Sequence, residues 1–150
     1  MIQGILHVGL TVSDIDRSAA FYKDCLGLSY LGELCMEGKE TDRLFQKENA
    51  KARVAYLNGS DAIAAPPIEL IQFVDTKARK SKADLFKTSV SEICFYTSDI
   101  AADYQRLLHH GVECLSPPQE FDFTAQGFGK SLALYFKDPD GILLELMQTL

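Results

Sequence analysis

The sequence lacks several features that identify whole classes of protein. Its four cysteines form no C-x-x-C pair, so neither a zinc ribbon nor a redox dithiol is indicated. No stretch approaches the roughly 20 apolar residues of a membrane span, and the first residues carry neither a basic leader nor an apolar segment of signal length. We therefore expect a reduced, cytoplasmic protein whose thiols are packing residues and which does not enter a membrane.

An excess of basic residues is also missing. The net charge is −6 at pH 7, whereas nucleic-acid binding draws on clustered lysine and arginine, so no nucleic-acid partner is expected. There are no low-complexity tracts, and 47% hydrophobic with 24% charged residues is typical of a soluble globular protein. A chain of 150 residues can bury about two thirds of its unfolded surface, which suits one domain or a close pair of half-size modules.

What is present is an internal repeat. The segment HVGLTVSDI at residues 7–15 recurs 85 residues later as EICFYTSDI at residues 92–100. The alternation in each copy predicts a strand with two different faces. A helix should follow each strand, with Ser13 and Ser98 as N-caps, and Gly27 and Gly111 stand where a left-handed residue ends a helix.

The repeat predicts an α+β fold of two βαβββ modules within a single domain, residues 1–150. Module 1 covers residues 1–74, a linker covers residues 75–88, and module 2 covers residues 89–150. The linker is rich in lysine and arginine, which either attract an anionic substrate or solvate a connection. The predicted segments are a strand and a variable connection over residues 28–52, strands at 53–57, 68–73 and 112–115, a loop at 116–130, and a hairpin of 131–136 with 142–148.

A glutamate occupies the same place in the last strand of each module. Residues 68–72 (IELIQ) and 144–148 (LELMQ) match in kind at all five positions, which makes Glu69 equivalent to Glu145 and His7 equivalent to Glu92. Two carboxylates about 4 Å apart repel by about 4 kcal/mol at an effective dielectric constant near 20. If these glutamates share a cleft, a cation must be present, one carboxyl is protonated, or one lies outside it.

These features together resemble the vicinal oxygen chelate superfamily. They are a strand opening with His7, a helix ending in Leu-Gly-Leu, an internal glutamate strand and a closing D-P-D-G-x-x-x-E-L strand. The superfamily includes glyoxalase I, methylmalonyl-CoA epimerase, fosfomycin-resistance enzymes, extradiol dioxygenases and metal-free bleomycin-binding proteins. The resemblance implies curved mixed sheets around a central cleft.

The resemblance also implies a divalent metal ion (Zn, Ni, Mn, Fe or Mg) with ligands on four strand positions. The ligands would be His7, Glu69, Glu92 and Glu145. Glu92 departs from the family pattern, which usually has histidine there, and it could instead form a salt bridge across the module interface. The alternative for His7 is a hydrogen-bonded strand histidine.

Two functions follow from the resemblance. The first is a glyoxalase-like lyase or isomerase that moves a proton next to a carbonyl through a metal-bound enediolate, with Glu145 or its twin Glu69 as the base. An extradiol dioxygenase is disfavoured because it needs two histidines. The second function is metal-free binding of a drug or metabolite, as in bleomycin-resistance proteins.

Both functions imply a small-molecule partner. The residues expected to bind it are aromatic: Tyr96, Phe121, Phe123, Phe128 and Tyr135. The phenylalanines lie on the predicted loop and either close over a ligand or cap the edge of the core. A homodimer is expected, and the two modules either pair within one chain or exchange between chains.

Overall fold

The computed structural model describes residues 4–59, 67–79 and 82–150. The chain divides into two compact units, Met1–Lys80 and Ser81–Leu150. Within the described residues, no helix is both long and apolar enough to cross a membrane.

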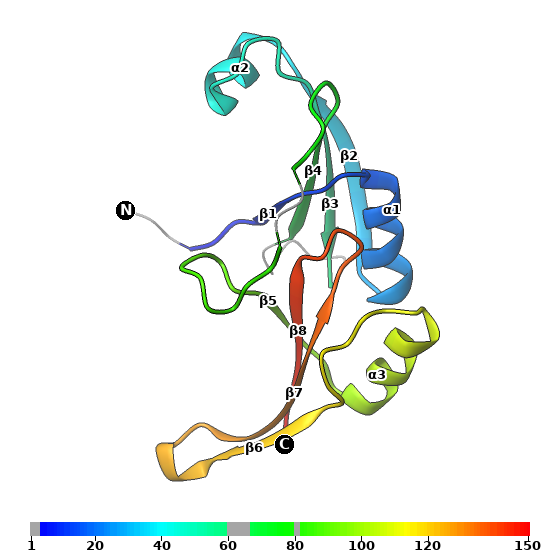
Figure 1. The fold of residues 1–150 in the computed structure, drawn as a ribbon, viewed down its shortest axis with the longest axis vertical. Coiled ribbons are helices and arrows are strands. Elements are labelled where there is room, and N and C mark those ends of the chain that lie inside the picture. Colours follow the sequence, from blue (N-terminus) through cyan, green and yellow to red (C-terminus); the bar gives the residue numbers. More distant parts are fainter. Residues whose placement is uncertain (1–3, 60–66, 80–81) are drawn as a thin grey trace. The chain divides into compact units, whose positions relative to one another are not determined.

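Unit 1 is a four-stranded mixed sheet with two helices (Figure 1). Its strand order is β1-β4-β3-β2. The pairing of β1 with β4 is parallel, and the other two pairings are antiparallel. Its elements in chain order are β1 (Val8–Thr11), α1 (Ile15–Ala20) with a π-helical turn η1 (Phe21–Cys25), β2 (Ser29–Met36), α2 (Lys39–Phe45), β3 (Ala52–Asn58) and β4 (Ile68–Phe73).

Unit 2 repeats this topology. Its strand order is β5-β8-β7-β6, again with a parallel pair between the first and last strands. Two four-stranded mixed sheets with a few helices confirm the α+β fold class. The elements of unit 2 are β5 (Ile93–Tyr96), α3 (Ile100–His109), β6 (Gln119–Phe123), the 3₁₀ turn η2 (Thr124–Gln126), β7 (Gly129–Lys137) and β8 (Leu143–Thr149).

The first helix of each unit is tied to the last strand by the same hydrogen bond. The backbone N–H of Ile15 donates to Oε1 of Gln72, and that of Ile100 donates to Oε1 of Gln148, both at 2.9 Å. The two glutamines are equivalent in the repeat, so this anchor was duplicated together with the fold. It holds each helix against one face of its sheet.

The helix caps differ from the prediction by one residue. Asp14 and Asp99 are the N-caps, and their carboxylates accept backbone N–H groups of the first turn. Serine was predicted, but a carboxylate at the next position is the stronger acceptor for the positive end of a helix. Gly27 and Gly111 have φ of 75° and 70°, which confirms the predicted left-handed residues.

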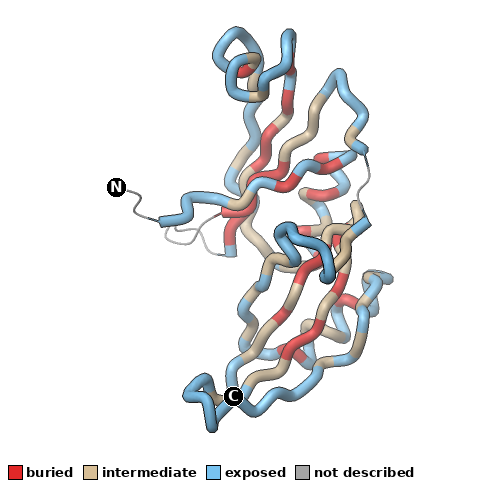
Figure 2. The backbone as a smooth tube through the Cα atoms, turned by 60° about the vertical axis from the view of Figure 1, so that its left-hand side comes forward, coloured by how far each residue is buried: buried red, intermediate tan, exposed pale blue. Residues whose placement is uncertain are grey.

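The core of each unit lies between its helix and the helix-facing side of its sheet. Buried residues follow the central strands (Figure 2). In unit 1 they include Leu57 and Leu70, and in unit 2 they include Phe136 and Leu144, each fully buried. The opposite face of each sheet carries the equivalent glutamates.

Three predicted segments differ from the structure in whole or in part. In residues 28–52 the predicted strand is present as β2 (Ser29–Met36), but the connection after it contains the helix α2. Its N-cap Gly38 makes no side-chain hydrogen bond, and it buries Thr41 but no apolar residue, so periodicity could not reveal it. Residues 112–115 form no strand but a single bridge between Cys114 and Phe136. The strand beside β7 is instead β6, within the segment predicted as a loop. The hairpin of β7 and β8 is confirmed, and Asp138 accepts hydrogen bonds from the backbone of its turn.

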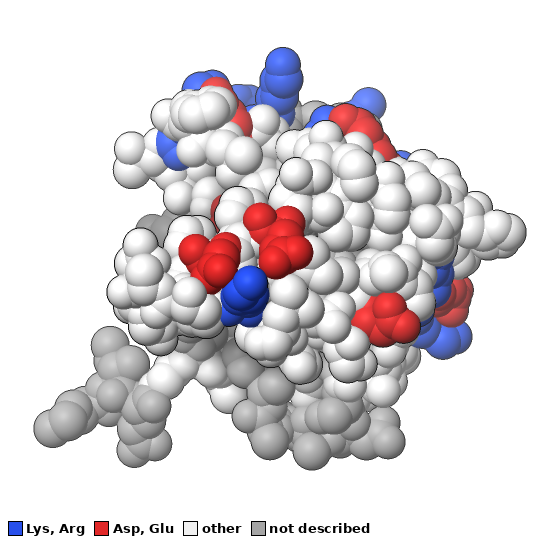
Figure 3. Space-filling model, turned by 90° about the horizontal axis from the view of Figure 1, so that it is seen from below, with Lys and Arg blue, Asp and Glu red and all other residues white. Residues whose placement is uncertain are grey.

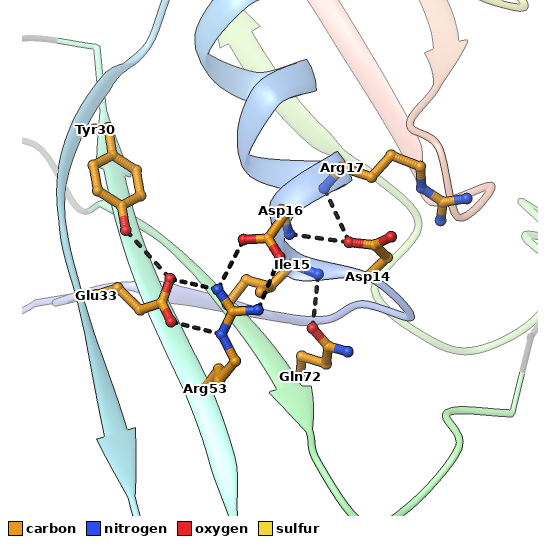
Figure 4. A network of polar contacts seen from close by, with 8 residues as sticks. All are labelled: Asp14, Ile15, Asp16, Arg17, Tyr30, Glu33, Arg53 and Gln72. Carbon is orange, nitrogen blue, oxygen red and sulfur yellow. Dashed lines mark hydrogen bonds and ion pairs between the residues drawn. The ribbon is translucent and has the colours of Figure 1, made fainter.

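Arg53 joins α1 to β2 and β3 on the helix-facing side of unit 1 (Figure 4). Its guanidinium donates two hydrogen bonds to the Asp16 carboxylate, at 2.8 and 2.9 Å, and two to Glu33, at 2.6 and 3.0 Å. These bonds raise the pKa of Arg53 and lower that of Asp16 below 3.8. Because both carboxylates occupy the guanidinium, Arg53 is a structural cation rather than a receptor for an anionic substrate.

We predict that Arg53→Ala lowers the melting temperature at neutral pH by a few degrees, and by more than Arg43→Ala, which removes an exposed arginine. The folded pKa of Asp16 is depressed, so its contribution is present above the unfolded pKa and lost as pH falls through the folded value. Thermal unfolding followed by circular dichroism should therefore show the difference between the two variants shrinking as pH falls below 3.8, the ordinary pKa of an aspartate. Equal melting temperatures at neutral pH would contradict this role.

Candidate functional site

The side of the unit 1 sheet opposite α1 presents a glutamate among three neighbours. Glu69 on β4 lies directly across from Gly9 on β1 and from Tyr56 on β3. Cross-strand partners point to the same side of a sheet, so these side chains share one face. His7 immediately precedes β1 and is in phase with Gly9.

The contacts of Glu69 use both carboxylate oxygens. The hydroxyl of Tyr56 donates to Oε1 at 2.7 Å, and Nε2 of His7 lies 3.2 Å from Oε2. The rings of His7 and Tyr56 meet edge to face, with centroids 6.3 Å apart. Glu69 is 8% exposed, so its charge is compensated mainly by these groups. The structure brings His7 and Glu69 together and adds Tyr56, which the sequence placed on a strand matching that of Tyr135, lining either the core or a pocket.

The hydrogen bond changes the acidity of Tyr56. Donation to Glu69, followed by desolvation and the charge of the same carboxylate, raises the pKa of the phenol from 10.0 to about 12. The folded protein keeps a proton that the unfolded chain releases between these values. The stabilisation is therefore complete below pH 10 and is lost as pH rises through about 12.

Unit 2 repeats the register with different side chains. Glu145 on β8 lies across from Cys94 on β5 and from Tyr135 on β7. Desolvation, a hydrogen bond from the thiol to Glu145 and the charges of Glu145 and Glu92 together raise the pKa of Cys94 to about 12. Desolvation and the same carboxylates also raise the pKa of Tyr135. The charges of Glu92 and Glu145 thus both raise the pKa of Cys94 and of Tyr135.

The two units differ at the position opposite the glutamate on β1 and β5. A Cβ atom on Gly9 would lie 3.2 Å from Oε2 of Glu69, so glycine leaves this oxygen the room to face His7. The equivalent residue in unit 2 is Cys94, which lies directly across from Glu145 and whose thiol contacts the carbonyl oxygen of Phe95 at 4.0 Å. A thiol is a weak donor compared with a phenol. Glu69 thus accepts a hydrogen bond from a strong donor, Tyr56, and the neighbour across from Glu145 offers a weak one.

Four of the five predicted aromatic residues share a face with Glu145 but lie at different distances from it. Tyr96, Phe121 and Phe123 pair with residues in phase with Glu145 or Tyr135. Phe121 is opposite Ser131, four residues before Tyr135, or about 13 Å along β7. Phe121 and Phe123 stack on one another with centroids 5.9 Å apart, and Phe128 is 85% exposed. Tyr135 is the residue of this set that lies beside Glu145.

The charged groups at this hairpin are paired. Nζ of Lys130 lies 3.2 Å from the Asp122 carboxylate and 4.0 Å from that of Glu120. On the face shown in Figure 3, acidic and basic side chains alternate within a broad uncharged area. No patch of one sign gathers on that face.

The donor chemistry suits a divalent cation, although the two units contribute separately. Among residues 4–59, 67–79 and 82–150, no three His, Cys, Asp or Glu side chains are arranged to hold a metal ion. His7 and Glu69 nevertheless place a nitrogen and an oxygen 3.2 Å apart. Two ligands about 2.1 Å from one ion and at right angles lie about 3 Å apart, so this pair fits two adjacent coordination positions.

Comparisons with known proteins agree with the architecture. The model of the Glyoxalase/Bleomycin resistance protein/Dioxygenase superfamily matches residues 4–146, which confirms the resemblance found in the sequence. A virulence protein of Salmonella typhimurium is 28% identical over 99% of this chain and 85% of its own length. The uncharacterized protein YaeR of Escherichia coli is 27% identical over 98% of this chain and 97% of its own.

Solved structures show the same fold. A glyoxalase family protein from Bacillus cereus superimposes with a TM-score of 0.85 at 22% identity, covering 100% of this chain and 96% of that one. The trypanothione-dependent glyoxalase I of Leishmania major gives 0.70 at 20% identity, covering 98% and 87%. At these identities the likeness concerns the fold.

We predict that one tyrosine hydroxyl of the protein ionises at unusually high pH, and that it belongs to Tyr56. Absorbance at the phenolate band during a pH titration should show a component near pH 12 in the wild-type protein. Glu69→Gln removes the carboxylate charge and should move this component toward 10. Glu145→Gln is the matched control and should leave it in place. If the absorbance component near pH 12 is unchanged in Glu69→Gln, the raised pKa of Tyr56 does not come from Glu69.

Proposed function

Because the chain belongs to the Glyoxalase/Bleomycin resistance protein/Dioxygenase superfamily, we propose that it is a metal-dependent, glyoxalase-like lyase or isomerase. Its reaction moves a proton on a carbon next to a carbonyl group of a small molecule. The contact between Nε2 of His7 and Oε2 of Glu69 is the observation that carries the proposal, because it brings two potential metal-ligand atoms together beside a buried carboxylate.

The residues that would hold the cation are His7 and Glu69 of unit 1 and Glu92 and Glu145 of unit 2. One imidazole and three carboxylates suit Zn, Ni, Mn, Fe or Mg. When bound, the ion would act as a Lewis acid on the substrate oxygens. It would also compensate the carboxylates, whose mutual repulsion disfavours an assembly without a cation.

Glu145 is the base in this proposal. Both oxygens of Glu69 already have partners, the Tyr56 hydroxyl and His7, whereas the residue across from Glu145 on β5 is Cys94, whose thiol is a weak donor. The weaker donor leaves a Glu145 oxygen able to accept a proton from the substrate carbon and return it to the neighbouring carbon. General-base catalysis of this kind contributes about 10² to 10⁴ in rate.

The alternative is a metal-free protein that binds a drug or metabolite. One observation favours it: Tyr56, Glu69 and His7 satisfy one another without an ion. In that case Tyr96, Tyr135 and the exposed phenylalanines would contact the ligand and no chemistry would follow.

Metal content separates the two functions. If the protein is a metal-dependent enzyme, it should contain about one divalent ion per chain after purification without chelator, and His7→Ala and Glu145→Ala should each lose this ion. His109→Ala is the control, because His109 is exposed at the end of α3 and its loss should not change metal content. Elemental analysis provides the measurement. Metal content near zero, with no uptake of added Ni²⁺, Mn²⁺ or Zn²⁺, would support the binding protein.

We also propose that the protein is a homodimer, as the sequence analysis predicts. Light scattering coupled to size-exclusion chromatography should then give twice the chain mass of 16.7 kDa. A mass equal to that of one chain would contradict this assembly.

A further inference from the structure

Tyr56 and Tyr135 occupy the same position in the two units but differ in their hydrogen bonding to the glutamate opposite. Each tyrosine lies directly across from the glutamate of the closing strand. Tyr56 donates a 2.7 Å hydrogen bond to Glu69, whereas the structure shows no such bond between Tyr135 and Glu145. The duplicated register therefore provides a natural internal comparison for the role of the phenol.

We propose that Tyr56 is a positioning residue that fixes the carboxylate of Glu69 for cation binding. The inference rests on the proposed function, since it assigns a task to a residue beside the proposed ligands. The terminal torsion of a glutamate has a broad, roughly two-fold preference, so a free carboxylate turns easily. A charge-assisted bond from a phenol to Oε1 stops this rotation and leaves Oε2 facing Nε2 of His7.

The surroundings make Tyr56 difficult to replace in this task. Glu69 is 8% exposed, so little water is available to hold the carboxylate in its place. Tyr56 also meets the ring of His7 edge to face, so one side chain borders both proposed ligands of unit 1. The hydrogen of Gly9 completes the arrangement, because any larger side chain would approach Oε2 within 3.2 Å.

The test is metal affinity, which needs no substrate. Tyr56→Phe removes the hydroxyl and keeps the ring, and Tyr135→Phe makes the same change at the equivalent position of unit 2. Calorimetric titration with Ni²⁺ or Mn²⁺, below the melting temperature of each variant, should give about tenfold or greater loss of affinity for Tyr56→Phe. Tyr135→Phe should stay within about twofold of wild type. Equal affinities of Tyr56→Phe and wild type would overturn the proposal.

A double-mutant cycle separates positioning from a general structural role. If Tyr56 acts through Glu69, then Tyr56→Phe should have less than about a twofold effect in a Glu69→Gln background. A full tenfold effect in that background would overturn the proposal. If Tyr56→Phe fails to fold, Gly9→Ala tests the same carboxylate with the hydroxyl intact. Its Cβ would lie 3.2 Å from Oε2 and push this oxygen aside by a few tenths of an ångström, so it should also weaken metal binding. Wild-type affinity in Gly9→Ala would overturn the proposal.

The proposed function fails in a different way. A wild-type protein that binds none of Ni²⁺, Mn²⁺ or Zn²⁺ overturns the metal-dependent enzyme, and the positioning role falls with it. A wild-type protein that binds metal, together with a Tyr56→Phe variant of unchanged affinity, overturns the positioning role alone.

Discussion

The buried carboxylate of Glu69 is the constraint on which the rest of unit 1 depends. An isolated ionised carboxylate is costly to remove from water, and the free-energy cost falls only when donors occupy its oxygens. Tyr56 and His7 supply those contacts from the two strands that flank β4. Each of them reaches Glu69 because β1 runs parallel to β4 and β3 runs antiparallel to it, in a register that places all three side chains on one face.

The same register in unit 2 gives a different chemical result. Glu145 has Cys94 and Tyr135 across from it, and Glu92 takes the place of His7. Unit 1 thus has an imidazole and a strong hydrogen-bond donor beside its glutamate, while unit 2 has a second carboxylate and a thiol, which is a weak donor. Duplication preserved the backbone, the helix anchors through Gln72 and Gln148 and the glutamates, and it let the neighbours diverge.

The features that could be predicted from the sequence are those carried by local patterns. The repeat and the equivalence of Glu69 with Glu145 follow from alternation and order alone. The helix α2 was missed because it buries no apolar residue and lacks a side-chain cap. The alternation of Phe121 and Phe123 with acidic residues could have revealed β6. The contact between Tyr56 and Glu69 could not be predicted, because it depends on the register between β3 and β4, which no local pattern encodes.

The different neighbours of Glu69 and Glu145 matter for a reaction that needs one carboxylate to hold an ion and another to move a proton. A carboxylate that only holds an ion keeps one orientation throughout turnover, whereas one that also acts as the base must accept a proton, turn toward a second carbon and release it. A phenol bonded to Oε1 favours the first task and hinders the second. A thiol, as a weak donor, holds a carboxylate loosely enough for the second. Glu69 and Glu145 are equivalent in the repeat. In the proposed enzyme, the neighbour of each glutamate therefore decides which of them acts as the base.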